Sequence, residues 1–154
     1  MKRALWGMAM LLCWCSSGGG GGGSTDYAPN FAGTWKGTLT LMSGGQTMTT
    51  DAGNVMITET GVNVLGIPSP CFYVHGAPDA GIPDLAGTVS SATSATFGAY
   101  TCPAGSSTSC TSVVQHWDGI TGSLSGTTLS LDGTGTFVGC SVTQQYAATF
   151  VGSH

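Results

Sequence analysis

A histidine and a carboxylate stand close together in the segment SVVQHWD, where His116 and Asp118 are two residues apart. Such a pair suits acid–base catalysis or weak metal binding, provided that both side chains point the same way. On a β-strand they do, because side chains two residues apart share a face. The competing interpretation, which we favour, is a strand end that enters an Asp–Gly turn with Trp117 packed inward.

A second group of polar side chains occupies the irregular stretch HGAPDAGIPD, residues 75–84. His75, Asp79 and Asp84 offer oxygen and nitrogen donors that could ligate a cation such as Ca²⁺. A proline-rich surface loop whose acidic residues serve solubility explains the same stretch more simply. We therefore expect no metal site here.

Other catalytic signatures are missing from the sequence. It contains no G-x-S-x-G segment, Glu59 is the only glutamate, and no glycine-rich stretch opens a helix after a strand, as nucleotide-binding loops do. We predict that the protein is not an enzyme and uses no cofactor.

Beyond the N-terminal region the chain contains four cysteines: Cys71, Cys102, Cys110 and Cys140. An even number in an exported chain predicts two disulfides, whereas a zinc site would need close C-x-x-C spacings that the sequence lacks. Four cysteines allow three pairings. We favour Cys102 with Cys110, which bracket the short loop CPAGSSTSC, and therefore Cys71 with Cys140.

The N-terminus has the pattern of a secretory signal. The first three residues, MKR, are a positive n-region, and residues 4–12 are an apolar stretch too short to span a bilayer. The end of this stretch resembles the lipobox of bacterial lipoproteins, in which a leucine stands three places before the acylated cysteine. Leu12 and Cys15 match those places, so the resemblance implies lipidation of Cys15 and a membrane anchor. Two alternatives stay open: acylation of Cys13, or a cut before Ser16 that yields a secreted protein.

The chain then divides into a signal and lipobox region at residues 1–15, a Gly/Ser-rich tether at 16–29, and one folded domain at 30–154. A flexible linker of about ten residues has an r.m.s. span of about 17 Å. In the lipoprotein family, serine directly after the acylated cysteine goes with delivery to the outer membrane. We expect the domain to be displayed there, in the cell envelope.

Charge is scarce in this chain, because only 6% of the residues are charged and the net charge is −4. Without the signal, Lys36 is the only basic residue, and one cation against seven acids gives about −6. Such a chain cannot neutralise a row of phosphates, so we expect no nucleic-acid partner.

From residue 30 onward apolar and polar residues alternate between glycine-containing turns, and no helical period occurs. In FAGTWKGTLTL the side chains of Phe31, Trp35 and Leu41 would face a core while Lys36 faces water. Further strands are expected in the segments QTMTT, NVMITET, VNVLGI, CFYVH, LAGTVSS, SATFGAY, SVVQHWD, ITGSLSG, TTLSLDG, TGTFVGC and VTQQYAATFV.

Strands of about five to eight residues joined by short turns predict an all-β fold, an antiparallel meander closed into a small up-and-down β-barrel of about 8 strands. Closure removes exposed strand edges, which this chain has almost no Lys or Arg to protect. The first and last strands would then pair. A two-sheet β-sandwich is the alternative.

The interior of so small a barrel is either packed by side chains or hollowed for one small ligand. The candidates for lining such a cavity are Trp35, Leu39, Tyr73, Trp117 and Tyr146. Two functions follow: binding of a small apolar ligand, or interaction with another surface protein through the loops of a filled barrel.

The segment NFAGTWKGTLTL resembles the opening strand of lipocalin-like and avidin-like barrels, which begin with Gly-x-Trp, and the final TFVGSH is similar to the closing strand of avidins. The segments FGAYTCPAGSSTSCTSVV and GSLSGTTLSLDGTGTFVGC are similar to small glycine-tethered lipoproteins of Gram-negative bacteria. These resemblances imply a lipid-anchored β-barrel. They imply no substrate, and the cavity tryptophans that avidins use for biotin are missing.

Overall fold

The computed structural model of the protein describes residues 23–68, 70–71, 83–107 and 110–154. No helix in these ranges has the length and apolar character that crossing a bilayer needs. The elements are, in chain order, α1 (Ala28–Phe31), β1 (Gly33–Ser43), β2 (Gln46–Gly61), β3 (Val64–Ile67), β4 (Leu85–Ser91), β5 (Ser94–Phe97), β6 (Tyr100–Thr101), β7 (Gly105–Ser107), β8 (Cys110–Ser125), β9 (Thr128–Gly139) and β10 (Val142–Ser153).

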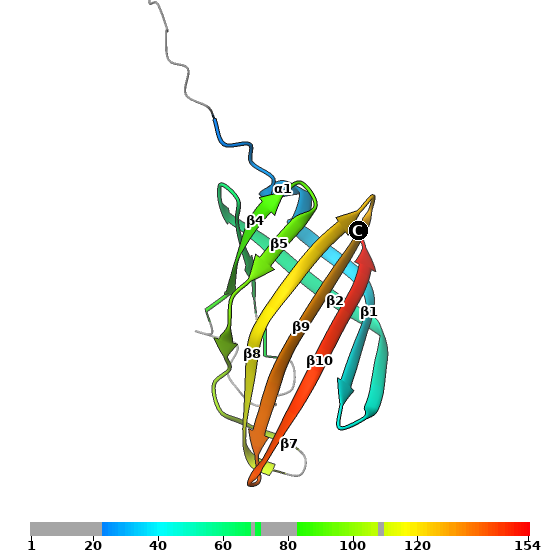
Figure 1. Ribbon diagram of the computed structural model, residues 1–154, viewed down its shortest axis with the longest axis vertical. Helices are drawn as coiled ribbons and strands as arrows, with labels where there is room; N and C mark the ends of the chain where they lie inside the picture. Colours follow the sequence, from blue (N-terminus) through cyan, green and yellow to red (C-terminus); the bar gives the residue numbers. More distant parts are fainter. Residues whose placement is uncertain (1–22, 69, 72–82, 108–109) are drawn as a thin grey trace, which may run out of the picture.

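Eight of these strands form a closed antiparallel ring (Figure 1). The order is β5, β4, β3, β2, β1, β10, β9, β8, and the pairing of β5 with β8 closes the circle. The short strands β6 and β7 pair with β8 in addition to the ring. The predicted up-and-down barrel is confirmed. The expected pairing of the first and last strands is confirmed too, with Lys36 opposite Ser153 and Ser43 opposite Tyr146.

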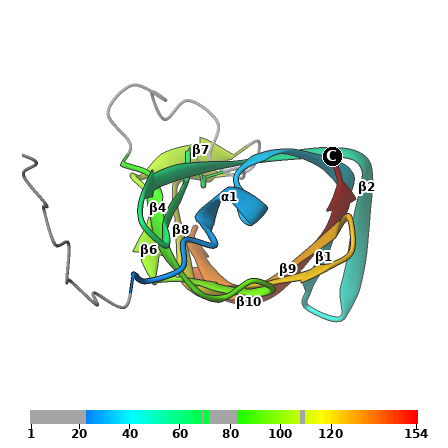
Figure 2. The same ribbon diagram turned by 90° about the horizontal axis from the view of Figure 1, so that it is seen from above.

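One end of the barrel is closed by α1, which lies inside the outline of the ring (Figure 2). The helix begins at a proline-containing first turn, and its Ala28 and Phe31 are fully buried. Trp35, on the strand that follows, donates a hydrogen bond from its indole Nε1 to the carbonyl oxygen of Phe31 at 2.9 Å. The apolar face predicted for β1 therefore packs against the helix that precedes it.

The chain leading into α1 is held by the turn between β2 and β3. Asn63 accepts a hydrogen bond from the backbone N–H of Tyr27 at 2.7 Å and donates one from its Nδ2 to the carbonyl of Thr25 at 2.9 Å. The carboxylate of Asp26 in turn accepts the N–H of Asn63 at 3.2 Å. The later part of the segment predicted as a tether is therefore bound to the barrel.

Several strands are longer than the sequence predicts. SVVQHWD and ITGSLSG form the single strand β8, TTLSLDG and TGTFVGC form β9, and QTMTT and NVMITET form β2. Asp118–Gly119 was expected to turn the chain and instead lies within β8, and Asp132–Gly133 likewise lies within β9. At the first pair the β8–β9 register shifts between Trp117 and Gly119. Most of CFYVH lies outside the described residues.

Glycines within these strands leave room for large inward side chains. An added Cβ at Gly133 would lie 2.9 Å from the Trp117 ring, and one at Gly135 would collide with the ring of Tyr146 and the main-chain oxygen of His116. The sheet can curve tightly at these positions because glycine opposes a bulky neighbour. In-strand glycine is thus a requirement of this barrel's packing.

The disulfides confirm that all four cysteines pair, but the favoured pairing was wrong. The bridges are Cys71–Cys102 and Cys110–Cys140. The N–H of Cys102 bonds the carbonyl of Gln115 on β8 at 2.8 Å, five residues beyond Cys110. Since a strand advances about 3.3 Å per residue, Cys102 lies about 17 Å from Cys110, too far for a bridge.

We predict that Gly135→Ala lowers the free energy of unfolding by about 1–3 kcal/mol, because the new methyl group has no space between the Tyr146 ring and a backbone oxygen. Gly98→Ala is the matched control, since the nearest atom to its Cβ is 4.0 Å away. Urea denaturation measures both. Equal stability of the two variants would contradict this account of the strand glycines.

Candidate functional site

The buried side chains form two clusters along the barrel. The larger one, near α1, includes Phe31, Trp35, Ile57 and Leu65. The second is a layer formed by Leu41, Trp117, Tyr146 and Ala148, with Phe137 packed against it. Trp117 meets Tyr146 edge-on at 5.1 Å between ring centroids, and Phe137 stacks on Tyr146 at 4.4 Å. This aromatic layer divides the interior in two.

On the α1 side of the layer lies a partly open space, the inner cavity, with a volume of about 180 Å³. Leu39, Trp117, Phe150 and Pro70 are among the residues that line it. The indole Nε1 of Trp117 donates a hydrogen bond to the carbonyl oxygen of Pro70 at 3.0 Å, so its only polar atom is already satisfied. The cavity is comparable in size to engineered apolar cavities that bind benzene.

On the other side of the layer, at the end of the barrel opposite α1, lies a larger open space that we call the mouth hollow. Its volume is about 340 Å³. None of the described side chains that line it is charged. They are the apolar Leu41, Met48, Val113, Phe137 and Val142, the polar Ser43, Gln46 and Gln144, and Cys110 and Gly139.

Met48 belongs to the hollow because the β1–β2 turn sets its register. Gly44 and Gly45, with φ of 58° and 77°, connect Ser43 directly to Gln46, which places Met48 opposite Leu41 on the inward face. Met48 is nevertheless 58% exposed, since no described side chain fills the space in front of it. An exposed inward methionine is an adaptable apolar contact for a ligand.

The five predicted cavity residues have different positions. Leu39 and Trp117 line the inner cavity, and Tyr146 belongs to the aromatic layer. Trp35 lines neither space, because it is buried between the carbonyl of Phe31 and the ring of His154, whose centroid is 3.7 Å away. Tyr73 lies outside the described residues. Met48 and Val142, which line the mouth hollow, were not predicted as cavity residues. The Gly–Gly turn could have indicated Met48, because it sets the pairing of Met48 with Leu41.

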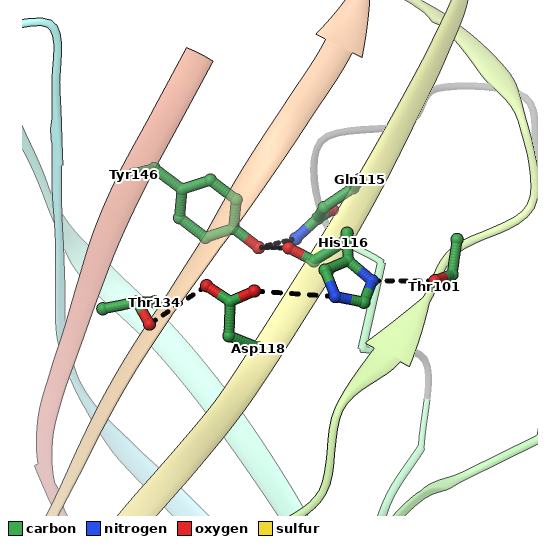
Figure 3. Close-up of polar contacts among 6 residues, drawn as sticks. All are labelled: Thr101, Gln115, His116, Asp118, Thr134 and Tyr146. Atoms are coloured by element: carbon green, nitrogen blue, oxygen red, sulfur yellow. Dashed lines mark hydrogen bonds and ion pairs between the residues drawn. The ribbon is translucent and has the colours of Figure 1, made fainter. Parts of the chain in front are cut away.

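A polar network joins the aromatic layer to the outer face of β8 (Figure 3). The hydroxyl of Tyr146 accepts a hydrogen bond from Nε2 of the fully buried Gln115 at 3.2 Å and donates one to the carbonyl oxygen of His116 at 3.0 Å. These bonds pin a tyrosine of β10 to the backbone of β8. They hold the layer that forms the floor of the mouth hollow.

His116 and Asp118 share the outer face of β8, as their spacing predicts, while Trp117 packs inward. Nε2 of His116 lies 3.6 Å from Asp118, Nδ1 lies 2.8 Å from the hydroxyl of Thr101, and Thr134 donates to Asp118 at 3.3 Å. The His116 and Asp118 side chains are 37% and 56% exposed, so the contact between them contributes little to stability.

The remaining candidate residues are placed as follows. Asp84 is exposed and accepts a hydrogen bond from Thr58 at 3.4 Å. His75 and Asp79 lie outside the described residues, and so does the predicted lipidation site Cys15. Among the residues that the structure describes, no group of three His, Cys, Asp or Glu side chains could hold a metal ion.

Comparison with known proteins gives few matches. No model of a known protein family matches the sequence, and no curated protein matches it. Among solved structures, the chain is similar to a Bacteroides fragilis protein described as a "putative outer membrane protein", with 15% sequence identity and a TM-score of 0.48. The match covers 86% of this chain, which spans 54% of the length of that protein.

Burial raises the pKa of Tyr146 above its ordinary value of 10.0, and the Asp118 charge adds to this effect, while the hydrogen bond from Gln115 opposes it. The unfolded chain therefore ionises Tyr146 first as the pH rises. Stability from this group is fully present below about pH 10 and is lost above it.

We predict that Tyr146→Phe reduces stability by about 1–2 kcal/mol at about pH 8, because Gln115 loses a hydrogen-bond partner. By about pH 11 the difference from the wild type should shrink by roughly 1.4 kcal/mol, because the variant lacks the ionisable group. Urea denaturation across this pH range measures the gap. A constant gap would mean that Tyr146 ionises equally in both states.

Proposed function

We propose that this protein is an exported, lipid-anchored β-barrel that binds a small apolar ligand in its mouth hollow. The observation that supports the proposal best is the hollow itself, an uncharged and mainly apolar space of about 340 Å³ at an open barrel end. Ligand pockets of proteins have about 300–1,000 Å³ and the same composition of apolar walls with a few polar groups. Ser43, Gln46 and Gln144 supply those polar groups here.

The position of the hollow suits display from a membrane. The segment that enters α1 leaves one end of the barrel, whereas the β1–β2 and β9–β10 turns lie towards the other end (Figure 1). An acyl anchor on Cys15 would therefore hold the closed end nearest the lipid and leave the hollow facing away. This arrangement agrees with the resemblance to lipocalin-like barrels and to glycine-tethered lipoproteins.

We expect the wild type to bind N-phenyl-1-naphthylamine, a neutral apolar probe whose fluorescence rises in apolar surroundings. Met48→Gln should weaken binding about tenfold, because covering Met48 with ligand contributes about 1.4 kcal/mol. Met42→Gln is the matched control: Met42 is 57% exposed, against 58% for Met48, but lies next to Leu41 on the opposite face of β1.

Equal effects of the two methionine variants would place the probe outside the hollow. No binding by the wild type would instead favour the second candidate function, an interaction protein that works through its loops. That alternative expects the whole interior to be packed with side chains, as it is in the cluster around Phe31 and Trp35.

The anchor is tested separately by expressing the full chain in a Gram-negative host. The wild type should fractionate with membranes and show the mass of acyl chains on Cys15, since more than one chain holds a protein firmly to a bilayer. Cys15→Ala should be found in the soluble fraction, and Cys13→Ala should behave like the wild type. Loss of membrane association in Cys13→Ala alone would move the acyl acceptor to Cys13.

A further inference from the structure

The Cys110–Cys140 disulfide is part of the wall of the mouth hollow. Cys110 lines the hollow, and Cys140 lies in the β9–β10 turn between Gly139 and Val142, which line it as well. The β8–β9 ladder begins only at the pairing of Val113 with Gly139. The covalent bridge therefore connects the first residue of β8 to this turn.

The turn that carries Cys140 has an unfavourable backbone. Cys140 and Ser141 have φ of 50° and 64°, in the left-handed region, where residues with a Cβ are disfavoured. The equivalent turn between β1 and β2 uses two glycines for the same conformation. Such a conformation persists where its surroundings hold it in place, and the bridge to Cys110 is one such restraint.

The two disulfides also differ in access. In the Cys71–Cys102 bridge, Cys102 is only 2% exposed and Cys71 is partly exposed. In the Cys110–Cys140 bridge, Cys110 is partly exposed and Cys140 is exposed, at the rim of an open hollow. Thiol–disulfide exchange requires access to a sulfur atom, so a dithiol should reach the rim bridge first, because that bridge includes the exposed Cys140.

We propose that Cys110–Cys140 is a site of thiol–disulfide exchange that controls ligand binding in the mouth hollow. This inference rests on the ligand-binding function proposed above. A thiolate of a dithiol reductant attacks one sulfur of the bridge, and the other cysteine leaves as a thiolate that takes up a proton. The second thiol of the reductant then displaces the attacked cysteine. In total the bridge gains two electrons and two protons, and the dithiol becomes a disulfide.

Reduction would loosen one wall of the hollow. The β9–β10 turn would lose the restraint on its left-handed backbone, and Val142 would no longer be held at a fixed distance from Cys110 and Val113. A ligand seated between these side chains would lose apolar contacts. The oxidised protein is therefore the form with higher affinity, and the reduced form releases ligand.

The experiment titrates the wild-type protein with dithiothreitol, alkylates the exposed thiols with iodoacetamide, and identifies them by peptide mass. Binding of N-phenyl-1-naphthylamine is measured at each step. We expect Cys110 and Cys140 to be alkylated before Cys71 and Cys102, and the probe affinity to fall about tenfold over that first step, which corresponds to about 1.4 kcal/mol. The double variant Cys110→Ser, Cys140→Ser should show the low affinity without reductant.

Simultaneous reduction of both bridges, or earlier reduction of Cys71–Cys102, would overturn the proposal. Selective reduction with unchanged probe affinity would also overturn it, because the bridge would not act on the hollow. A wild type that binds no probe in its oxidised form would refute the ligand-binding function itself, whatever the order of alkylation. Should the double variant fail to fold, the wild-type titration still decides.

Discussion

The hydrogen-bonded ladder between β5 and β8 is the constraint on which the rest of the molecule depends. It pairs Ser94 with Ser123 and Phe97 with Ile120, and it turns a sheet with two open edges into a ring. A chain whose folded part has Lys36 as its only basic side chain has little else to protect an edge from other chains. The same closure excludes the two-sheet sandwich and gives the barrel an interior.

Ring closure sets the demands on the other elements. Eight strands must curve tightly around a narrow interior, and glycines opposite aromatic rings allow this, as at Gly87 beside Phe97 and Gly135 beside Tyr146. At one end α1 fills the ring with Phe31. At the other end the ladders run on past the aromatic layer, and no described side chain fills the space. The mouth hollow is the result of that asymmetry.

The local features of the fold could be predicted from the sequence, whereas those that depend on register could not. The inward face of β1, with Trp35 and Leu41, follows from alternation alone. The length of β8 does not, because Asp118–Gly119 is a frequent turn pair and only tertiary pairing keeps the strand continuous. The disulfide pairing likewise depends on strand register, which places Cys102 beside Gln115 in β8 and Cys140 beside Cys110 at the start of β8.

The candidate site shows the same division between local features and features that depend on register. Trp117 could be identified as a cavity residue because large inward aromatic side chains line barrels. Trp35 is also a large inward aromatic residue, so the sequence could not show that it is buried away from the cavity. The β9–β10 turn has Cys140 and Ser141 where hairpins of this kind usually have Asn–Gly, so its tightness had no sequence signal. The residues of the mouth hollow meet only because two hairpin turns align there.

The central claim is that the open barrel end binds a small apolar ligand. It is tested most directly by nuclear magnetic resonance of ¹³C-methyl-labelled methionine during titration with N-phenyl-1-naphthylamine. Met42, Met48 and Met56 are all exposed, and each reports on a different surface: the outer face of β1, the mouth hollow, and β2 beside the inner cavity. The account predicts that the Met48 methyl signal shifts with saturation while the Met42 signal stays in place. Saturable shifts at Met42 or Met56 with an unchanged Met48 signal would contradict it.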